Sequence, residues 1–335
     1  MTVSQPSASP TPASTSESGA SSLSPDKRLV VTNLRKAFGD RVALDGLSFD
    51  VRRGEIFGLL GPNGAGKTTA FRLLSGLLPA DKGSIWLDGQ SAEPSSLAFR
   101  SRLGVVFQDP SLDVKLTGRE NLALGAALFG LPRAIARKRI AEALELMQLG
   151  PRADEAVIRY SGGMKRRLEI ARVLLHEPDL LLLDEPGRGV DPEALRRIWE
   201  ELERLTETRG LSVIVTTHQP EEAERCRRVA VLDAGHLVAT GSPAELRARV
   251  AGDVVRIEGD EPQDIAQIIG SRLKLKAQVI AGVVCIETPR GPELIPRLAE
   301  IFPAGRLKSL STAQPTLADV FARLTGRGFG EEKLT

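Results

Sequence analysis

The stretch EIFGLLGPNGAGKTT, residues 55–69, decides the fold. Its first part, up to Leu60, is short and mostly apolar, which predicts a buried strand. Gly61 to Thr68 then fits GxxxxGK[ST], the pattern of a loop whose glycines let backbone N–H groups surround a phosphate. From Gly66 to Leu78 the apolar residues recur at helical intervals, and a helix N-terminus attracts anions. The order strand, loop, helix therefore predicts a phosphate site in an α/β fold.

The loop supplies the groups that a nucleoside triphosphate and its metal require. We expect the Lys67 ammonium to reach the β- and γ-phosphates and the Thr68 hydroxyl to be a ligand of Mg²⁺. A chance match is the alternative reading of so short a pattern, but the strand before the loop and the helix after it argue against chance. The residues of this segment predicted to bind the nucleotide are Gly61, Pro62, Asn63, Gly64, Ala65, Gly66, Lys67, Thr68 and Thr69.

A second strand signal ends in two acidic residues. Leu180 to Leu183 predict a central strand that is buried on both faces, and Asp184 and Glu185 follow directly. Parallel α/β sheets bind ligands at the carboxyl ends of their strands, so Asp184 is expected beside the phosphate loop, where it would hold Mg²⁺. Successive residues of a strand point in opposite directions, which leaves Glu185 to orient and polarise an attacking water. Alone, an apolar run with Asp-Glu is a weak signal; together with the loop it is a strong one.

Composition excludes several classes of protein. The chain has 335 residues with 45 Lys and Arg against 43 Asp and Glu, and this near-balance argues against a nucleic-acid binder with a strong basic field. Hydrophobic residues make up 41%, enough for a core, and two cysteines cannot form a disulfide framework. The sequence has neither an apolar stretch of about 18 residues, as a membrane span requires, nor a signal-peptide pattern. We therefore expect a cytosolic α/β protein.

Changes in composition and in hydrophobic pattern divide the chain into three parts. Residues 1–26 are rich in Ser, Thr and Pro and are predicted to be a disordered tail. Residues 27–248 alternate strand and helix signals, which predicts a mainly parallel sheet, with a helical subdomain at about 95–165. Residues 249–335 are expected to form a smaller C-terminal α/β accessory domain. Its predicted elements are strands at 254–257 and 279–286 and helices at 292–302 and 316–324.

One further glycine pair has two readings. Ser161 is a good helix N-cap, and Gly162 and Gly163 would leave the first N–H groups of that helix exposed. The segment is either an ordinary capped helix start or a second anion site, aimed at a phosphate that the chain's own loop does not hold. Spacing alone leaves both readings open.

The motifs together resemble those of the ATP-binding cassette (ABC) ATPases. The resemblance covers about residues 28–245 and implies a P-loop ATPase core with a mainly parallel sheet, a small antiparallel β part and a helical subdomain. It also implies a head-to-tail homodimer, in which ATP lies between one subunit's phosphate loop and Ser161, Gly162 and Gly163 of the other. The matching motifs, in order, are Gly61–Thr68, Gln108, Tyr160–Met164, Asp184–Glu185, Gly189–Pro192 and His218.

The same resemblance gives three isolated residues a role. Phe38 resembles the aromatic that stacks on adenine, where most relatives have Tyr; its alternative is a core Phe before a turn. Gln108 resembles the loop glutamine that touches Mg²⁺ and faces the membrane subunit. His218 resembles the switch histidine that contacts the γ-phosphate, although a lone His is more often structural. The implied catalytic residues are thus Glu185, His218 and Lys67, and the implied metal ligands are Thr68, Gln108 and Asp184.

Several positions depart from the family pattern. The signature reads Tyr-Ser-Gly-Gly-Met rather than Leu-Ser-Gly-Gly-Gln, Gly187 stands where relatives usually have Thr, and Gln219-Pro220 follows the histidine. None of these removes a catalytic group. The signature variant and the run from Leu317 to Gly326 resemble the daunorubicin-resistance branch of drug exporters. That run is also a plain amphipathic helix, with Leu317, Val320, Phe321 and Leu324 expected inward.

The resemblance implies the ATP-hydrolysing subunit of an exporter. It would power export of a drug-like or other small-molecule or lipid substrate through a separately encoded membrane permease, at the cytoplasmic face of the membrane. An importer subunit and a soluble, non-transport ABC ATPase are the alternatives, and an unrelated P-loop GTPase or kinase would leave Gln108 and His218 unexplained. All expected ATP ligands fall between Phe38 and His218, so the C-terminal domain is expected to be dispensable for nucleotide binding. A nucleic-acid partner is not expected.

Overall fold

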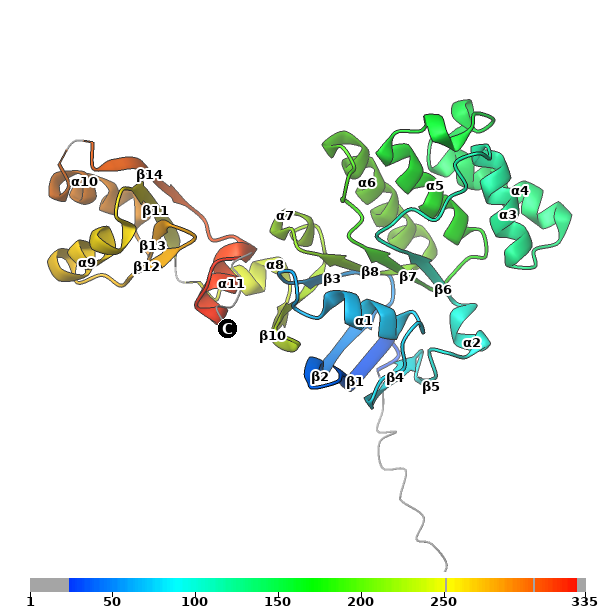
Figure 1. The fold of residues 1–335 in the computed structure, drawn as a ribbon, viewed down its shortest axis with the longest axis horizontal. Coiled ribbons are helices and arrows are strands. Elements are labelled where there is room, and N and C mark those ends of the chain that lie inside the picture. Colours follow the sequence, from blue (N-terminus) through cyan, green and yellow to red (C-terminus); the bar gives the residue numbers. More distant parts are fainter. Residues whose placement is uncertain (1–23, 251, 304, 330–335) are drawn as a thin grey trace, which may run out of the picture.

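The structure is a computed structural model that describes residues 24–250, 252–303 and 305–329. Residues 1–23 of the predicted tail lie outside the described part. In the described residues the strands form three sheets, two in the large unit at the right of Figure 1 and one in a smaller unit at its left. The described residues include no helix that is both long and apolar enough to cross a membrane.

A six-stranded sheet forms the centre of the large unit. Its order is β10-β9-β3-β8-β7-β6, with β10 antiparallel to β9 and the other neighbours parallel. Leu180 and Leu182 face one hydrophobic core, whereas Leu181 and Leu183 face the other, which explains the unbroken apolar run. The predicted α/β fold class is confirmed. The strands are β3 (Ile56–Leu60), β6 (Leu103–Val106), β7 (Leu180–Asp184), β8 (Ser212–Thr217), β9 (Arg228–Asp233) and β10 (His236–Gly241).

An antiparallel sheet and helix α1 (Lys67–Leu74) cover one face of the central sheet. The helix ends earlier than the expected Leu78, because the chain turns at Gly76. This glycine has a φ of +74°, and a Cβ there would lie 2.1 Å from the Pro94 carbonyl oxygen. The antiparallel strands, in the order β2-β1-β4-β5, are β1 (Lys27–Phe38), β2 (Arg41–Arg52), β4 (Lys82–Leu87) and β5 (Gln90–Ala92).

Helices α3 to α7 cover the other face and extend into a lobe at the upper right of Figure 1, whereas α2 packs through Phe99 on the α1 side. The expected helical subdomain at 95–165 is wrong in one respect, because β6 lies within it and pairs with β7; its short apolar run gave too little signal. The helix at 192–209 is capped by Asp191 and ended by left-handed Gly210. The helices are α2 (Leu97–Arg100), α3 (Gly118–Leu128), α4 (Arg133–Leu146), η1 (Gly150–Arg152), η2 (Val157–Arg159), α5 (Gly162–Leu174), α6 (Pro192–Arg209), α7 (Pro220–Ala223) and α8 (Pro243–Arg247).

The smaller unit is a βαββαβ arrangement with its own core, of the ferredoxin-like kind. The single strand expected at 279–286 is wrong: it is a hairpin, because Ala281 and Gly282 both have positive φ, as a type I′ turn requires. Helix α9 was not predicted. The elements are β11 (Asp253–Gly259), α9 (Pro262–Leu273), β12 (Ala277–Ile280), β13 (Val283–Thr288), α10 (Gly291–Ile301) and β14 (Leu307–Ala313), and the sheet order is β12-β13-β11-β14.

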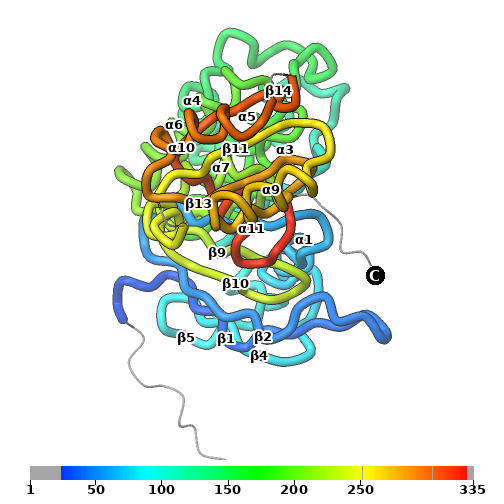
Figure 2. Tube along the Cα trace, turned by 90° about the vertical axis from the view of Figure 1, so that its left-hand side faces the viewer, coloured from blue at the N-terminus to red at the C-terminus, as the bar shows by residue number. Residues whose placement is uncertain are grey.

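The last helix, α11 (Leu317–Thr325), leaves the small unit and packs on the large one beside α7 and α8 (Figures 1 and 2). Leu317, Val320 and Phe321 are fully buried in the core that covers the central sheet. The expectation that Leu324 also points inward is wrong, since it is 37% exposed. Helix α11 therefore belongs to the ATPase core by packing, although it follows the accessory domain in sequence.

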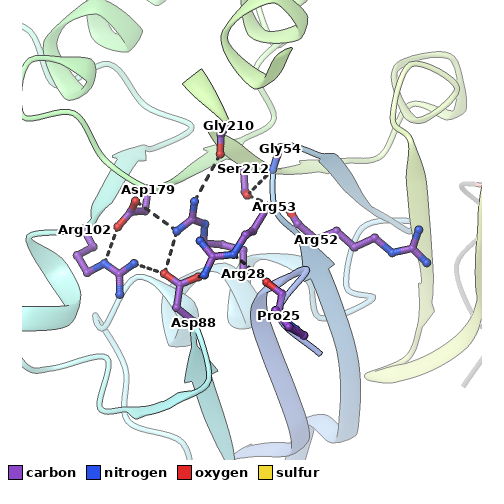
Figure 3. Close-up of polar contacts among 10 residues, drawn as sticks. All are labelled: Pro25, Arg28, Arg52, Arg53, Gly54, Asp88, Arg102, Asp179, Gly210 and Ser212. Atoms are coloured by element: carbon purple, nitrogen blue, oxygen red, sulfur yellow. Dashed lines mark hydrogen bonds and ion pairs between the residues drawn. The ribbon is translucent and has the colours of Figure 1, made fainter. Parts of the chain in front are cut away.

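An arginine–aspartate network joins the antiparallel sheet to the amino ends of β6 and β7 (Figure 3). Asp88 accepts a hydrogen bond from Arg28 at 2.8 Å, forms an ion pair with Arg53 at 2.6 Å, and also pairs with Arg102. Asp179 pairs with Arg102 at 2.5 Å and with Arg28 at 3.3 Å. The network lies at the end of the sheet opposite to the phosphate loop, and so it supports the fold without entering the site.

Candidate functional site

The phosphate loop is held by contacts that only glycine permits. Gly66, the residue before α1, has a φ of +102°, and a Cβ there would lie 2.8 Å from the Ala43 carbonyl oxygen. A Cβ on Gly61 would lie 2.5 Å from the Leu232 carbonyl oxygen. The loop therefore lies between Leu232 of β9 and Ala43 of β2. The N-terminus of α1 is directed at the interior of the loop.

Lys67 folds back over the loop. Its ammonium donates to the carbonyl oxygens of Gly61 at 2.7 Å and Pro62 at 3.0 Å. Burial lowers the pKa of Lys67, and the negative charges of Glu185 and Asp184 oppose that shift. A phosphate bound in the loop would favour the charged ammonium in the same way, so the side chain suits an anionic ligand.

Glu185 is held from both sides by the two isolated residues that the sequence singled out. Gln108 Nε2 donates to one carboxylate oxygen at 2.9 Å, and His218 Nδ1 lies 2.8 Å from the other. The backbone of Glu185 has a φ of +43°, a strained conformation for a residue with a side chain. This left-handed turn at the end of β7 directs the carboxylate toward Gln108 and His218.

Asp184 lies at the carboxyl end of β7 and is buried. One of its carboxylate oxygens accepts a hydrogen bond from the Thr216 hydroxyl of the neighbouring strand. Burial raises the pKa of Asp184, with the Thr216 bond acting in the opposite direction. A divalent cation would favour the ionised form, so the carboxylate and the exposed Thr68 hydroxyl are a fitting donor set for Mg²⁺.

Most of these groups line one cavity of about 1170 Å³, whereas Gly61 and Asp184 are not part of its lining. Phe38 lies at its edge and is 48% exposed, so the alternative of a core phenylalanine is wrong. The expected residues that line it come from five separated chain segments, which the sequence order alone does not bring together. Its expected lining residues are Phe38, Pro62, Asn63, Gly64, Ala65, Gly66, Lys67, Thr68, Thr69, Gln108, Glu185 and His218.

Comparison with known proteins agrees with this arrangement. A family model described as "ABC transporter" matches residues 44–188. The chain is 42% identical over 311 residues to the Nod factor export ATP-binding protein I of Ralstonia nicotianae, covering 89% of this chain and 94% of that protein. This chain is an ATP-binding subunit of the ABC transporter family. The protein of the same name in Paraburkholderia xenovorans is 40% identical, over 90% of this chain and 98% of its own.

Solved structures carry the same fold. The cbiO1 protein of Clostridium perfringens, described as part of the ABC transporter complex cbiONQ, has a TM-score of 0.63 and 31% identity, and the match covers 74% of this chain and 96% of that one. The cassette MJ0796, described as a dimer in a post-hydrolysis state with ADP and Pi, has a TM-score of 0.58 and 27% identity, covering 64% and 98%. ABC ATPases bind and hydrolyse ATP, so this chain is an ATPase.

The signature residues of this ABC ATPase do not reach its own nucleotide cavity. Ser161 caps α5 by accepting from the Met164 N–H at 3.2 Å, and both Ser161 and Gly162 are exposed. Gly163 is buried, and a Cβ there would lie 2.4 Å from the Ala194 side chain. The capped helix start is therefore present, and its exposed N-terminus leaves room for an anion from another subunit.

Arg166, one turn into α5, supports the site through backbone contacts and was not predicted. Its guanidinium donates to the Asp184 carbonyl oxygen at 2.7 Å and to the Phe107 carbonyl oxygen at 2.6 Å. It also pairs with Glu169 at 3.3 Å, and both side chains are buried. Arg166 thus fixes the strand end that carries Asp184 and the residue before Gln108. The sequence offered only a basic run after the signature.

The space beside Gly187, where relatives usually have Thr, is filled by another side chain in the structure. A Cβ at this position would lie 1.8 Å from Glu222 Oε1, so the buried Glu222 carboxyl occupies the space of a side chain. Burial raises the pKa of Glu222, and a hydrogen bond from Thr217 and the nearby His218 oppose the rise. The departure at position 187 is therefore matched to an acidic neighbour from α7.

Sequence reasoning missed part of the cavity wall. Arg41, Val42, Ala43, Arg188, Asp233, Ala234 and Arg327 also line it. Arg327 belongs to the C-terminal region, so the cavity wall extends beyond the span from Phe38 to His218 in which the ATP ligands are expected. Of these residues, only Arg41 could have been expected at the cavity from the sequence, because it lies close to Phe38. Asp233 and Arg327 reach the cavity through tertiary packing.

Proposed function

We propose that this chain is the ATP-hydrolysing subunit of an exporter, working as a head-to-tail homodimer on a separate membrane permease at the cytoplasmic face of the membrane. The carrying observation is the placement of the Glu185 carboxylate, between Gln108 and His218, in one cavity with the phosphate loop. This arrangement of a base beside a triphosphate cradle is what hydrolysis requires.

The residues divide the reaction between them. Phe38 presents its ring for stacking on adenine, and the loop from Gly61 to Thr69 holds the phosphates. Glu185 orients a water in line with the γ-phosphate and accepts its proton as the water oxygen bonds to phosphorus. The bond from that phosphorus to the β–γ bridging oxygen breaks, which leaves ADP and inorganic phosphate. His218 holds the carboxylate and contacts the γ-phosphate.

Thr68, Asp184 and Gln108 are the proposed holders of Mg²⁺. When bound, the ion neutralises charge on the β- and γ-phosphates. Asp184 contributes a carboxylate that its surroundings keep in place through the Thr216 hydroxyl and the Arg166 contact to its backbone. Gln108 connects this cluster to the helical lobe, because it lies in the loop between β6 and α3.

Two observations support a partner in the membrane. Most of the exposed large apolar side chains lie on α2 to α4 and their loops, where a soluble monomer gains nothing from them. The same lobe contains the loop of Gln108, so a permease seated there would act directly on the catalytic cluster. The exposed apolar residues of this lobe are Leu97, Val114, Leu124, Leu128, Phe129, Ile135 and Ile158.

Export is favoured over import by the relatives and by two sequence features. The relatives from Ralstonia nicotianae and Paraburkholderia xenovorans are both named for Nod factor export. The Tyr-Ser-Gly-Gly-Met signature and the run from Leu317 to Gly326 resemble drug exporters of the daunorubicin-resistance kind. We therefore propose an amphiphilic small molecule or lipid-like compound as the exported class.

Inside-out vesicles test this function. The chain is co-expressed with a candidate membrane permease, and ATP-dependent uptake of daunorubicin and of a labelled Nod factor is measured. Uptake of either probe is expected with the wild-type chain and not with Lys67→Ala, whose ATP turnover should fall by about 100-fold because the charge at the phosphates is lost. ATP-driven loss of a preloaded probe from the vesicles would indicate import and would contradict the proposal.

A further inference from the structure

Helix α11 has two faces that serve different domains. Its apolar face, with Leu317, Val320 and Phe321, is fully buried against the ATPase core beside α7 and α8. Its charged face pairs with the sheet of the C-terminal domain: Asp319 with Arg256 at 2.5 Å, and Arg323 with Glu287. The helix is therefore a rigid connection between the two units, which Figure 1 shows lying between them.

The end of α11 turns the chain toward the nucleotide cavity. Gly326 has a φ of +75° and ends the helix in the left-handed conformation, with its N–H bonded to the Ala322 carbonyl oxygen. The next residue, Arg327, lies with its guanidinium carbon 5.6 Å from the Phe321 ring centre, and Phe329 packs edge-on against the same ring at 4.8 Å. The buried Phe321 ring thus fixes the direction of the Arg327 side chain.

Arg327 pairs with Asp233 inside the wall of the cavity. The guanidinium donates to an Asp233 carboxylate oxygen, and the two side chains are only 18% and 13% exposed. Both residues line the nucleotide cavity together with the phosphate loop. An ion pair so shielded from solvent is screened much less by salt than a surface pair.

Asp233 begins the turn that braces the phosphate loop. The turn continues through Ala234 and Gly235, both with positive φ, and the Gly235 N–H donates to the Ala65 carbonyl oxygen at 3.0 Å. Gly235 in turn accepts from the Asp45 N–H at 3.0 Å. A continuous set of contacts therefore runs from the C-terminal sheet through α11, Arg327 and Asp233 to the phosphate loop.

We propose that Arg327 is a positioning residue of the nucleotide site, through which docking of the C-terminal domain sets the affinity for ATP. This inference rests on the proposed nucleotide site. By holding the turn from Asp233 to Gly235 against the loop, Arg327 keeps the loop in its binding geometry. A C-terminal domain that moves α11 away would loosen the turn and weaken ATP binding.

Titration of the full chain with a fluorescent ATP analogue tests the proposal. Arg327→Met, which keeps length and ring packing, is expected to weaken binding by about tenfold, within the usual range for coupling between two parts of a protein. Arg327→Lys should restore most of the affinity. Asp233→Asn should weaken binding similarly, and the double variant should be no weaker than either single one, because both changes remove the same contact.

Arg290→Met is the matched control, since it removes an exposed ion pair with Glu293 of the C-terminal domain without touching α11 or the cavity. It should leave the affinity at the wild-type value. Wild-type affinity in Arg327→Met would overturn the proposal, and so would equal weakening in Arg290→Met, which would indicate a general effect of losing an arginine charge. Binding by the wild-type chain in the same titration tests the nucleotide site separately from the role of Arg327.

Discussion

At the scale of single residues, the site depends on how Glu185 is held, with its carboxylate in contact with Gln108 and His218. Lys67, Asp184 and Glu185 were predictable because each follows a motif with a known strand or loop around it. The left-handed backbone of Glu185, which directs its carboxylate to Gln108 and His218, was not predictable, because strand alternation implies no such turn. Arg166 was missed because its partners are backbone carbonyls far away in the sequence.

Glu222 gives a prediction about pH. Burial raises the pKa of Glu222 in the folded state. The neutral carboxyl therefore contributes to the stability of the fold below the ordinary carboxyl pKa, and this contribution is lost as the pH rises through the raised pKa. Glu222→Gln stays neutral throughout and keeps the size. Its free energy of unfolding should therefore exceed that of the wild type at neutral pH, and the difference should shrink in mildly acidic buffer.

Denaturant unfolding of both chains across that pH range measures the difference. Glu221→Gln, at the exposed neighbouring position, is the control and should follow the wild type. A Glu222→Gln difference that is the same at acidic and neutral pH would mean that the pKa of this carboxyl is the same in the folded and unfolded states, contrary to the expectation.

At the scale of elements, strong periodicity or a clear cap gave correct boundaries. The helix expected at 316–324 agrees within one residue with α11 (Leu317–Thr325), which Thr316 caps and Gly326 ends. The hairpin at Ala281 and Gly282 was read as one strand, since the apolar run continues through the turn. Strand β6 was missed for the opposite reason: its few residues gain their conformation from pairing with β7 rather than from their own pattern.

The network around Asp88 is an element-scale feature that a variant can test. Asp88→Asn would leave the guanidinium groups of Arg28, Arg53 and Arg102 close together with half of their counter-charge removed. Because Arg28 and Asp88 are largely buried, the free energy of unfolding should fall by about 2 kcal/mol. ATP affinity should be unchanged, since the network lies at the far end of the sheet.

Asp154→Asn provides the comparison for that experiment. It breaks one exposed pair with Arg119, which should lower the free energy of unfolding far less than Asp88→Asn does. If chemical denaturation gives the two variants equal stability, the Asp88 network does not join the antiparallel sheet to the core in the way described.

At the scale of the whole molecule, the sequence predicted two units but not how they are connected. Helix α11 was assigned to the accessory domain, yet its apolar face completes the ATPase core and the next residues reach the nucleotide cavity. No local pattern encodes such docking, because an amphipathic helix looks the same whichever surface it covers. The pairing of subunits is likewise an inference from the exposed Ser161 and Gly162, which face away from their own chain's cavity.

The central claim is a shared site, with one subunit's Glu185 and phosphate loop completed by the other's Ser161 and glycines. Glu185→Gln keeps the size of the side chain but is not a useful base, so hydrolysis should fall roughly 100-fold or more while Mg-ATP binding survives. ATP then remains between the subunits and holds them together. Adding Ser161→Arg should separate them, because a bulky side chain would lie where the partner's γ-phosphate must fit.

Size-exclusion chromatography of Glu185→Gln with and without Mg-ATP measures this most directly. The account predicts a dimer that forms only with Mg-ATP and returns to monomer when Ser161→Arg is added. A Glu185→Gln chain that binds ATP and remains monomeric, or one that hydrolyses ATP at the wild-type rate, would contradict it.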